Sequence, residues 1–134
     1  MRLLLDTHVF LWYITADPRL TVRVRDMVTS ADNEVFLSVA SIWEATIKHA
    51  LGRLPLPEPP ATYLPSPRHA HSITSLPIDE DVFPHLEALP AHHHDTFDRI
   101  LSAQSLQHGL TLVTVDRTLF SYDVPLLSAK EADA

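Results

Sequence analysis

The sequence has 134 residues, of which 46% are hydrophobic and 20% are charged, and this balance is typical of one folded domain with a sizeable core. It contains no cysteine, which excludes disulfides, thiolate metal ligands and cysteine nucleophiles. No apolar run approaches the roughly 20 residues of a membrane span, and an acid follows the first leucines too soon for a signal peptide, so we expect a single cytoplasmic domain over residues 1–134 with no membrane partner.

The net charge of −7 comes from the later part of the chain. Residues 1–53 carry six basic and six acidic residues, whereas residues 54–134 carry four basic and eleven acidic ones. This distribution argues against a broad basic face that grips a nucleic-acid backbone. It is compatible with RNA or DNA held through bridging metal ions, and it favours a basic protein partner.

The first half of the chain alternates apolar runs of strand length with segments of helical spacing. Thr21 is a suitable N-cap for one helix, Ser38 or Ser41 for another, and Gly52 stands where a helix usually ends. The elements predicted here, in chain order, are a strand at 2–5, a helix or loop at 7–13, a helix at 22–30, a strand at 34–38 and a helix that ends near residue 51.

The second half begins with residues 55–67, which hold six of the eleven prolines. They cannot form one regular helix, so we predict a surface excursion or a loose connection. The elements predicted after it are a helix or strand approach at 68–75, an extended piece at 76–78, a helix capped by Asp79 through residue 89, a helix at 95–108, a strand at 110–115 and an edge strand at 120–127. Strands alternating with helices predict an α/β fold with a central parallel sheet covered by helices on both faces.

Four carboxylates stand where apolar segments end or helices begin. Asp6 directly follows the first predicted strand and Asp116 the strand at 110–115, while Glu44 and Asp98 lie in the first turns of two predicted helices. In a parallel sheet the two strand ends share one edge, where open α/β folds place their ligands. Converging carboxylates repel one another, and a bound divalent cation relieves that repulsion. The pattern therefore predicts a metal-dependent site.

Two of these acids have simpler explanations. Asp6 could be only the N-cap of the next helix, or the nucleophile of a phosphatase, although His8 stands where one large phosphatase group has a second acid. Glu44 could be a surface acid paired with Lys48 one turn later. The core face of that helix would then carry its large apolar residues, Trp43, Ile47 and Leu51.

The helix predicted at 95–108 offers two acids on one face. Asp95 is interpreted as its N-cap or as support for a ligand, and Asp98, which precedes an apolar stretch, as the ligand itself. Thr7 and Thr114 each neighbour a strand-end acid, which suits the orientation of a ligand or a water.

The histidine run at 92–94 does not favour zinc. Three successive residues of a regular element point in different directions, whereas zinc sites use spaced ligands. We therefore interpret this run as a solvated loop that leads into the next helix.

Segments in order along the chain resemble the motifs of a known family. They are LLDTH at residues 4–8, SVASIWE at 38–44, HDTFDRILSAQ at 94–104 and TLVTVD at 111–116, and LGRLP at 51–55 resembles the stretch that often follows the second. Together they make the chain similar to the PIN-domain ribonucleases, and within them to the VapC toxins of bacterial type II toxin–antitoxin systems. The resemblance covers nearly the whole chain and retains all four acids.

The resemblance implies a metal-dependent endoribonuclease that hydrolyses phosphodiester bonds in cellular RNA and leaves a 5′-phosphate. Carboxylate ligation selects Mg²⁺, with Mn²⁺ as a possible substitute. We expect Asp6 and Asp98 to bind the metal directly, and Glu44 and Asp116 to complete the site. Two alternatives stay open: a catalytically silent PIN interaction module, and a phosphatase with Asp6 as its covalent nucleophile.

The resemblance also implies protein partners. We expect a homodimer bound by a small VapB-like antitoxin, which lays a segment across the groove of the toxin and brings an arginine near the acids. Apolar helix faces in residues 9–14 and 22–28 are the candidate surfaces for the dimer or the antitoxin.

Overall fold

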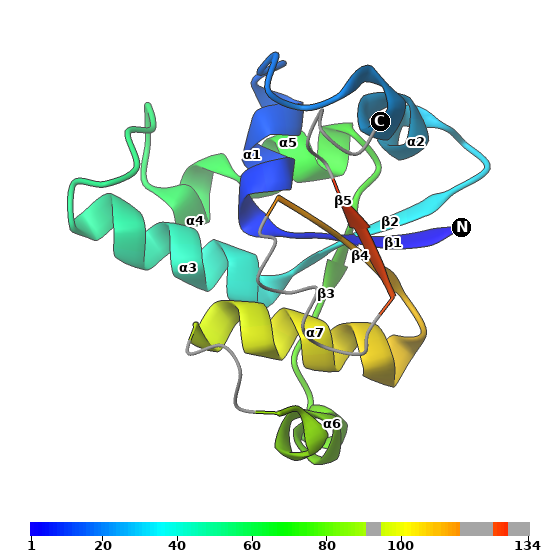
Figure 1. Ribbon diagram of the computed structural model, residues 1–134. Coiled ribbons are helices and arrows are strands. Elements are labelled where there is room, and N and C mark those ends of the chain that lie inside the picture. The colour runs from blue at the N-terminus through cyan, green and yellow to red at the C-terminus, as the bar shows by residue number, and fades with distance from the viewer. Residues whose placement is uncertain (91–94, 116–124, 129–134) are drawn as a thin grey trace.

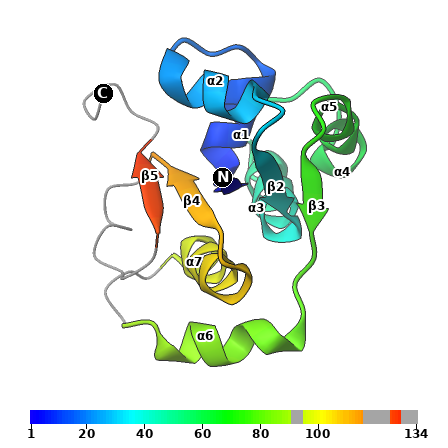
Figure 2. The same cartoon turned by 90° about the vertical axis from the view of Figure 1, so that its right-hand side faces the viewer.

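The computed structural model describes residues 1–90, 95–115 and 125–128, which form a five-stranded parallel sheet between two layers of helices (Figure 1, Figure 2). The strands are β1 (Arg2–Leu5), β2 (Glu34–Ser38), β3 (Thr74–Leu76), β4 (Thr111–Thr114) and β5 (Leu126–Ser128). The helices are α1 (Thr7–Ile14), α2 (Val22–Thr29), α3 (Val39–Ala50), α4 (Pro60–Tyr63), α5 (Pro65–Ala70), the 3₁₀ turn η1 (Glu80–Val82), α6 (Phe83–Ala88) and α7 (Thr96–His108). None of these described helices is long and apolar enough to cross a membrane.

The strand order β3-β2-β1-β4-β5 places β1 at the centre of the sheet. Leu5 at the end of β1 lies opposite Leu37 of β2 and Val113 of β4, both in parallel register. The chain runs outward from β1 to β2 and β3 on one side, and through β4 to β5 on the other, so the strand order reverses between β1 and β4. Open α/β sheets bind ligands at the carboxyl ends of the strands beside such a reversal, and Asp6 follows β1 there.

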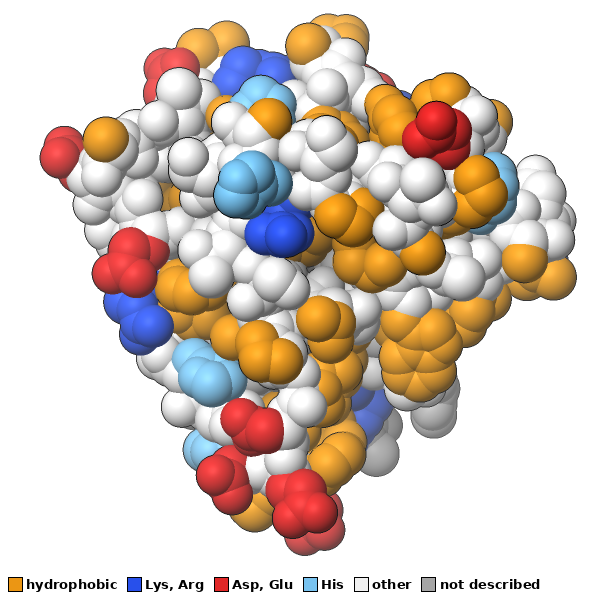
Figure 3. All heavy atoms as spheres, turned by 180° about the vertical axis from the view of Figure 1, so that it is seen from behind, with side chains coloured by type: hydrophobic (Ala, Val, Ile, Leu, Met, Phe, Trp, Pro, Cys, Tyr) orange, Lys and Arg blue, Asp and Glu red, His pale blue; other side chains and the backbone are white. Residues whose placement is uncertain are grey.

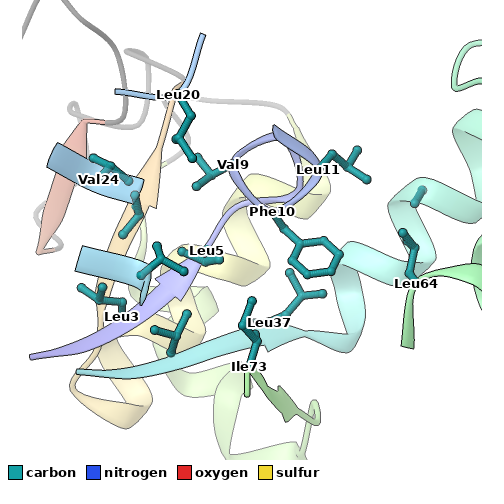
Figure 4. Packing of buried hydrophobic residues seen from close by; sticks show 14 residues of the cluster. Leu3, Leu5, Val9, Phe10, Leu11, Leu20, Val24, Leu37, Leu64 and Ile73 are labelled. Carbon is teal, nitrogen blue, oxygen red and sulfur yellow. The ribbon is translucent and has the colours of Figure 1, made fainter. Parts of the chain in front are cut away.

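The central strand β1 packs against both helical layers, because successive side chains of a strand point to opposite faces. Leu3 and Leu5 pack with Val9 and Phe10 of α1 and with residues of α2 (Figure 4). Leu4 joins a second cluster with residues of β4, η1 and α7. Burial of each such side chain stabilises the fold by roughly 1.5–3 kcal/mol. The predicted α/β fold, with helices on both faces of a parallel sheet, is confirmed.

The helix ends follow local signals in the sequence. Side-chain oxygens of Thr21, Ser38 and Asp95 accept backbone N–H groups in the first turns of α2, α3 and α7, as N-caps do. Gly52 and Gly109, which follow α3 and α7, have φ angles of 73° and 65°. Other residues pay roughly 1–2 kcal/mol in this left-handed conformation. The predicted N-caps of these three helices and the predicted end of α3 at Gly52 are therefore confirmed.

The proline-rich segment contains more regular structure than predicted. Pro60 and Pro65 occupy the first positions of α4 and α5, where a missing N–H costs nothing and the fixed φ suits a helix. The extended piece predicted at 76–78 is displaced, since β3 ends at Leu76. The last predicted strand overlaps β5 at residues 126–127, and residues 116–124 lie outside the described part of the chain.

The helix faces considered as docking surfaces contribute mainly to the core of the domain. Val9, Phe10 and Val24 are fully buried in the core, whereas Val22 is 72% exposed, so a partner surface at residues 9–14 or 22–28 stays a prediction. Their apolar spacing is used within the domain to pack α1 and α2 onto β1.

The orientation of α3 rejects the explanation of Glu44 as a surface acid. Trp43, Ile47 and Leu51, expected on the core face if Glu44 were a surface acid, are 53%, 40% and 61% exposed. The buried residues of this helix are instead Ala40, Ser41, Glu44 and Ala45. Small side chains allow α3 to lie close to its neighbours, and Glu44 finds polar partners there.

Candidate active site

Asp6 lies at the reversal of strand order and is only 4% exposed. Its Oδ1 accepts the N–H of Val9 at 2.8 Å, so the residue caps α1. Its Oδ2 accepts the hydroxyl of Thr114 at 2.6 Å and the N–H of Val115 at 3.1 Å, both from the end of β4. The aspartate therefore fixes where α1 begins and also joins the carboxyl ends of two neighbouring strands.

Burial dominates the electrostatics of this residue. Removal from water raises the pKa of Asp6 above its usual value of 3.8, and the hydrogen bonds from Thr114, Val9 and Val115 and the charge of His8 offset only part of that rise. Desolvation disfavours the charged form of a carboxyl group, and a nearby cation favours it. Asp6 is thus a carboxylate whose ionised form gains from a positive charge at the site.

Glu44 is the second buried acid of the site, with an exposed fraction of 6%. The hydroxyl of Thr7 donates to Oε1 at 2.5 Å, and Nζ of Lys48 lies 2.8 Å from Oε2. The ion pair considered from the sequence is therefore present, but the glutamate is not a surface residue. It faces α1, where Thr7 follows Asp6 directly, so a single threonine links the two buried acids.

Each of the two threonines predicted to support the site contacts an acid from a different part of the chain. Thr114 donates to Asp6, whereas Thr7 donates to Glu44 rather than to its neighbour in the sequence. These contacts join residues of β1, α1, α3 and β4 at one edge of the sheet. They suit the orienting role predicted for the two threonines.

Asp98 lies in the first turn of α7, half-buried. Asp95 is the N-cap of this helix, and its carboxylate accepts the N–H of Asp98 at 3.0 Å. The neighbouring ring of Phe97 meets Trp43 of α3 edge to face, with ring centroids 4.9 Å apart. Because these aromatic residues directly adjoin Asp98 and Glu44, the contact sets the first turn of α7 against α3.

The structure brings only part of the predicted acid set together. Within residues 1–90, 95–115 and 125–128, no group of three or more histidine, aspartate or glutamate side chains stands close enough to hold a metal ion. Asp116 and His92–His94 lie outside these ranges, so their placement in a site stays a prediction. The chemistry of the two buried donors, Asp6 and Glu44, fits a hard cation such as Mg²⁺, which prefers carboxylate oxygens.

Ser41 also lies in the region of the site, although its sequence position suggested only a possible helix N-cap. It is 2% exposed and lies one turn before Glu44 on α3, and its hydroxyl has no hydrogen-bond partner within the described residues. Its spacing of three residues from Glu44 was the available signal, since such residues share a helix face. A buried hydroxyl on this face marks it as polar.

Comparison with known proteins shows the family of the chain. Residues 3–124 match the PIN domain family. The chain belongs to that family. It is 30% identical to ribonuclease VapC22 of Mycobacterium tuberculosis over 123 residues, which cover 91% of this chain and 92% of that protein. A shorter match, 38% identical over 66 residues, relates it to ribonuclease VapC16 of the same organism, covering 46% of this chain and 47% of the relative.

Solved structures with this PIN fold include proteins of toxin–antitoxin complexes. VapBC2 from Rickettsia felis, solved with a fragment of its promoter DNA, matches with a TM-score of 0.72 at 12% identity, covering 96% of this chain and 98% of that one. FitAcB from Neisseria gonorrhoeae matches with a TM-score of 0.62 at 24% identity, covering 93% and 96%. At these identities the likeness concerns the fold, and it confirms the PIN architecture.

Proposed function

We propose that this PIN-domain protein is a Mg²⁺-dependent endoribonuclease toxin that cleaves cellular RNA in the cytoplasm. The observation that carries the proposal is the pair of buried acids, Asp6 and Glu44, linked through Thr7 at the carboxyl edge of the sheet. Its relatives VapC16 and VapC22 are named ribonucleases, which supports the same activity here.

In this proposal Asp6 and Asp98 hold the ion, and Glu44 and Asp116 complete its surroundings. The ion, with Mn²⁺ as a substitute, would increase the acidity of a water molecule and neutralise charge that develops on the phosphate. Asp6 is held rigidly by α1 and β4, and Glu44 by α1 and its own helix. Rigid placement matters because misplacement of about 1 Å costs such sites much of their rate.

The phosphatase alternative loses support from the contacts of Asp6. Oδ1 is engaged by the cap of α1 and Oδ2 by two donors from the end of β4. A covalent nucleophile needs an unhindered oxygen that can reach phosphorus, and these donors would reduce its reactivity. The silent-module alternative is disfavoured because burial of acids without a functional gain would destabilise the fold.

A small VapB-like antitoxin is the proposed inhibitor. The support is that proteins of the same fold occur in complexes named VapBC. An acidic site with buried carboxylates suits an arginine from such a partner, because a guanidinium pairs with carboxylates in bidentate fashion.

We also propose a homodimer, and we place its interface on α3. The exposed apolar residues that recur every four positions along this helix form what we call the α3 face: Val39, Trp43, Ile47 and Leu51, which are 38%, 53%, 40% and 61% exposed. Residues four apart form a continuous ridge on a helix. Beside Trp43 lies an apolar cavity of about 350 Å³, lined also by Phe83 and Leu86 of α6 and Ile100 of α7.

A second copy of the chain fits this surface. Leu51 lies two helical turns, about 12 Å, beyond Trp43, so a two-fold axis near Ile47 would set Leu51 of each copy against the cavity of the other. A two-fold interface needs such a self-complementary ridge and hollow. The acidic side chains of η1 and α6 gather at one end of the molecule (Figure 3). In the proposed dimer the exposed Arg53 of one copy would face these acidic side chains of the other.

The substrate is tested most directly by mapping RNA ends in cells. After induction of the protein, new 5′-phosphate ends should accumulate at discrete positions in structured RNA such as tRNA or ribosomal RNA. Cells that express the Asp6→Asn protein at the same level provide the control. Cleavage limited to DNA, or identical ends with the variant, would refute the proposed function.

A further inference from the structure

Lys48 contacts the buried carboxylate of Glu44 at the candidate active site. The lysine side chain is 35% exposed and that of Glu44 is 8% exposed, with 2.8 Å between Nζ and Oε2. The ion pair therefore extends from the interior of the site toward solvent. Such pairs contribute little on an open helix surface, but a buried carboxylate left without a cation is costly. Lys48 supplies the positive charge that this carboxylate needs.

Both oxygens of Glu44 have a donor. Thr7 donates to Oε1 and Lys48 to Oε2, and the described residues contain no three-membered group of acids or histidines arranged for a metal. A divalent cation that uses Glu44 must take Oε2 from the ammonium group or share it. Sharing is unfavourable, because two cations at one oxygen repel each other strongly at such short distances.

We propose that Lys48 is a built-in counter-ion of the metal site, which holds Glu44 in place until a divalent cation displaces the ammonium group from Oε2. This inference rests on the proposed metal-dependent function. It makes Lys48 a positioning residue that competes with the metal. Removal of the ammonium group should then tighten metal binding, whereas loss of a residue that merely supports the fold would leave binding unchanged or weaken it.

The test is calorimetric titration of the purified, RNA-free protein with Mn²⁺. Lys48→Met keeps most of the aliphatic side chain and removes the charge, and it should bind Mn²⁺ about tenfold more tightly, since a charge at this distance shifts equilibria by about that factor or more. Lys48→Arg should bind like the wild type. Arg23→Met, which removes an exposed charge on α2, should change the affinity less than about twofold.

A double-mutant cycle shows whether the effect acts through Glu44. In a Glu44→Gln background the same Lys48→Met change should no longer tighten Mn²⁺ binding, because the contested carboxylate is gone. Thermal unfolding with and without Mn²⁺ gives a second readout. The ion should raise the melting temperature of Lys48→Met more than that of the wild type.

The outcomes separate the inference from the function on which it rests. Equal Mn²⁺ affinity of the wild type and Lys48→Met, weaker binding by Lys48→Met, or an equal gain in Arg23→Met would overturn the role of Lys48 and leave the metal-dependent function intact. If neither the wild type nor Lys48→Met binds Mn²⁺ or Mg²⁺, metal dependence and the counter-ion role both fail. Binding detectable only in Lys48→Met would support the inference.

Discussion

Asp6 combines a structural task with the proposed chemical one. Its Oδ1 caps α1, and its Oδ2 ties β1 to the end of β4. From the sequence these were competing explanations of one residue, a helix cap or a metal ligand. The cap takes one donor at Oδ1, whereas the two donors from the end of β4 occupy Oδ2. A carboxylate oxygen has two lone pairs, so Oδ1 keeps one for the proposed cation and the cap does not exclude the proposed ligand role.

The raised pKa of Asp6 makes a prediction about stability in the absence of metal. Asp6 holds its proton more tightly in the folded state than in the unfolded state. Its contribution to the stability of the fold is therefore fully present below the usual pKa of 3.8 and is lost as the pH rises through the folded-state pKa. In EDTA, the stability of Asp6→Asn relative to the wild type should therefore rise as the pH rises from 3.8 through the folded-state pKa of Asp6, by about 1.4 kcal/mol for each unit by which that pKa is raised. An asparagine keeps the cap through its Oδ1. Its amide NH₂ replaces the acceptor of the Val115 N–H, which lowers stability by the same amount at every pH.

Urea denaturation of both proteins at several pH values measures this difference. Asp32→Asn, which alters an exposed acid, provides the matched control and should show no such trend. A difference between Asp6→Asn and the wild type that stays constant across this pH range would contradict the assignment of a raised pKa.

Thr7 makes a second prediction at this scale. Thr7→Val keeps the shape of the side chain but leaves Oε1 of the buried Glu44 without its hydroxyl donor. We expect a loss of about 1–3 kcal/mol in the free energy of unfolding, the usual cost of a buried acceptor without a partner. Thr7→Ser keeps the hydroxyl and should retain most of the stability. Equal unfolding midpoints for the valine and serine variants would show that the contact does not stabilise the fold.

At the scale of elements, the sequence was most informative where signals are local. The strand of three leucines before Asp6 and the caps at Thr21 and Asp95 depend only on neighbouring residues, and they were predictable. The short helices α4 and α5 were not, because prolines that interrupt a helix are the same residues that begin one.

The orientation of α3 was the least predictable feature of the site. The helix carries one row of large apolar residues and another row of small and polar ones, and spacing alone does not tell which row faces the sheet. Tertiary contacts decide: Glu44 faces inward to Thr7, and the row with Trp43 and Ile47 faces solvent. Asp116 lies outside the described residues, so its place in the site stays a prediction.

The exposed row of α3 predicts the oligomeric state. Ile47→Glu places a charge at the centre of the α3 face and should convert the proposed dimer to a monomer, because a buried charge without a partner is costly. Size-exclusion chromatography with light scattering measures this. Val22→Glu, at a residue of α2 that is 72% exposed, is the control and should remain dimeric. A monomeric wild type, or dissociation by Val22→Glu alone, would contradict this interface.

At the scale of the whole molecule, the net charge of −7 and the buried acids both indicate that RNA binding requires cations. An acidic protein does not attract an RNA backbone through a broad basic surface, so productive binding must depend on cations at the site. Metal removal should therefore affect substrate binding as well as the chemical step. Filter binding of RNA to the wild type with Mg²⁺ and with EDTA should show weaker retention in EDTA, and equal retention would contradict this link.

The central claim is that the carboxylates around Asp6 form a metal-dependent ribonuclease site. The measurement is cleavage of purified cellular RNA by the wild type, Asp6→Asn and Asp32→Asn, each with Mg²⁺ and with EDTA. We expect cleavage with 5′-phosphate ends by the wild type and Asp32→Asn in Mg²⁺ alone. Asp6→Asn should lose activity by at least about 100-fold, because mutation even of residues that only hold the metal ligands in place lowers activity or metal affinity by about 10–100-fold. Undiminished cleavage by a folded Asp6→Asn protein, or by the wild type after complete chelation, would contradict the account.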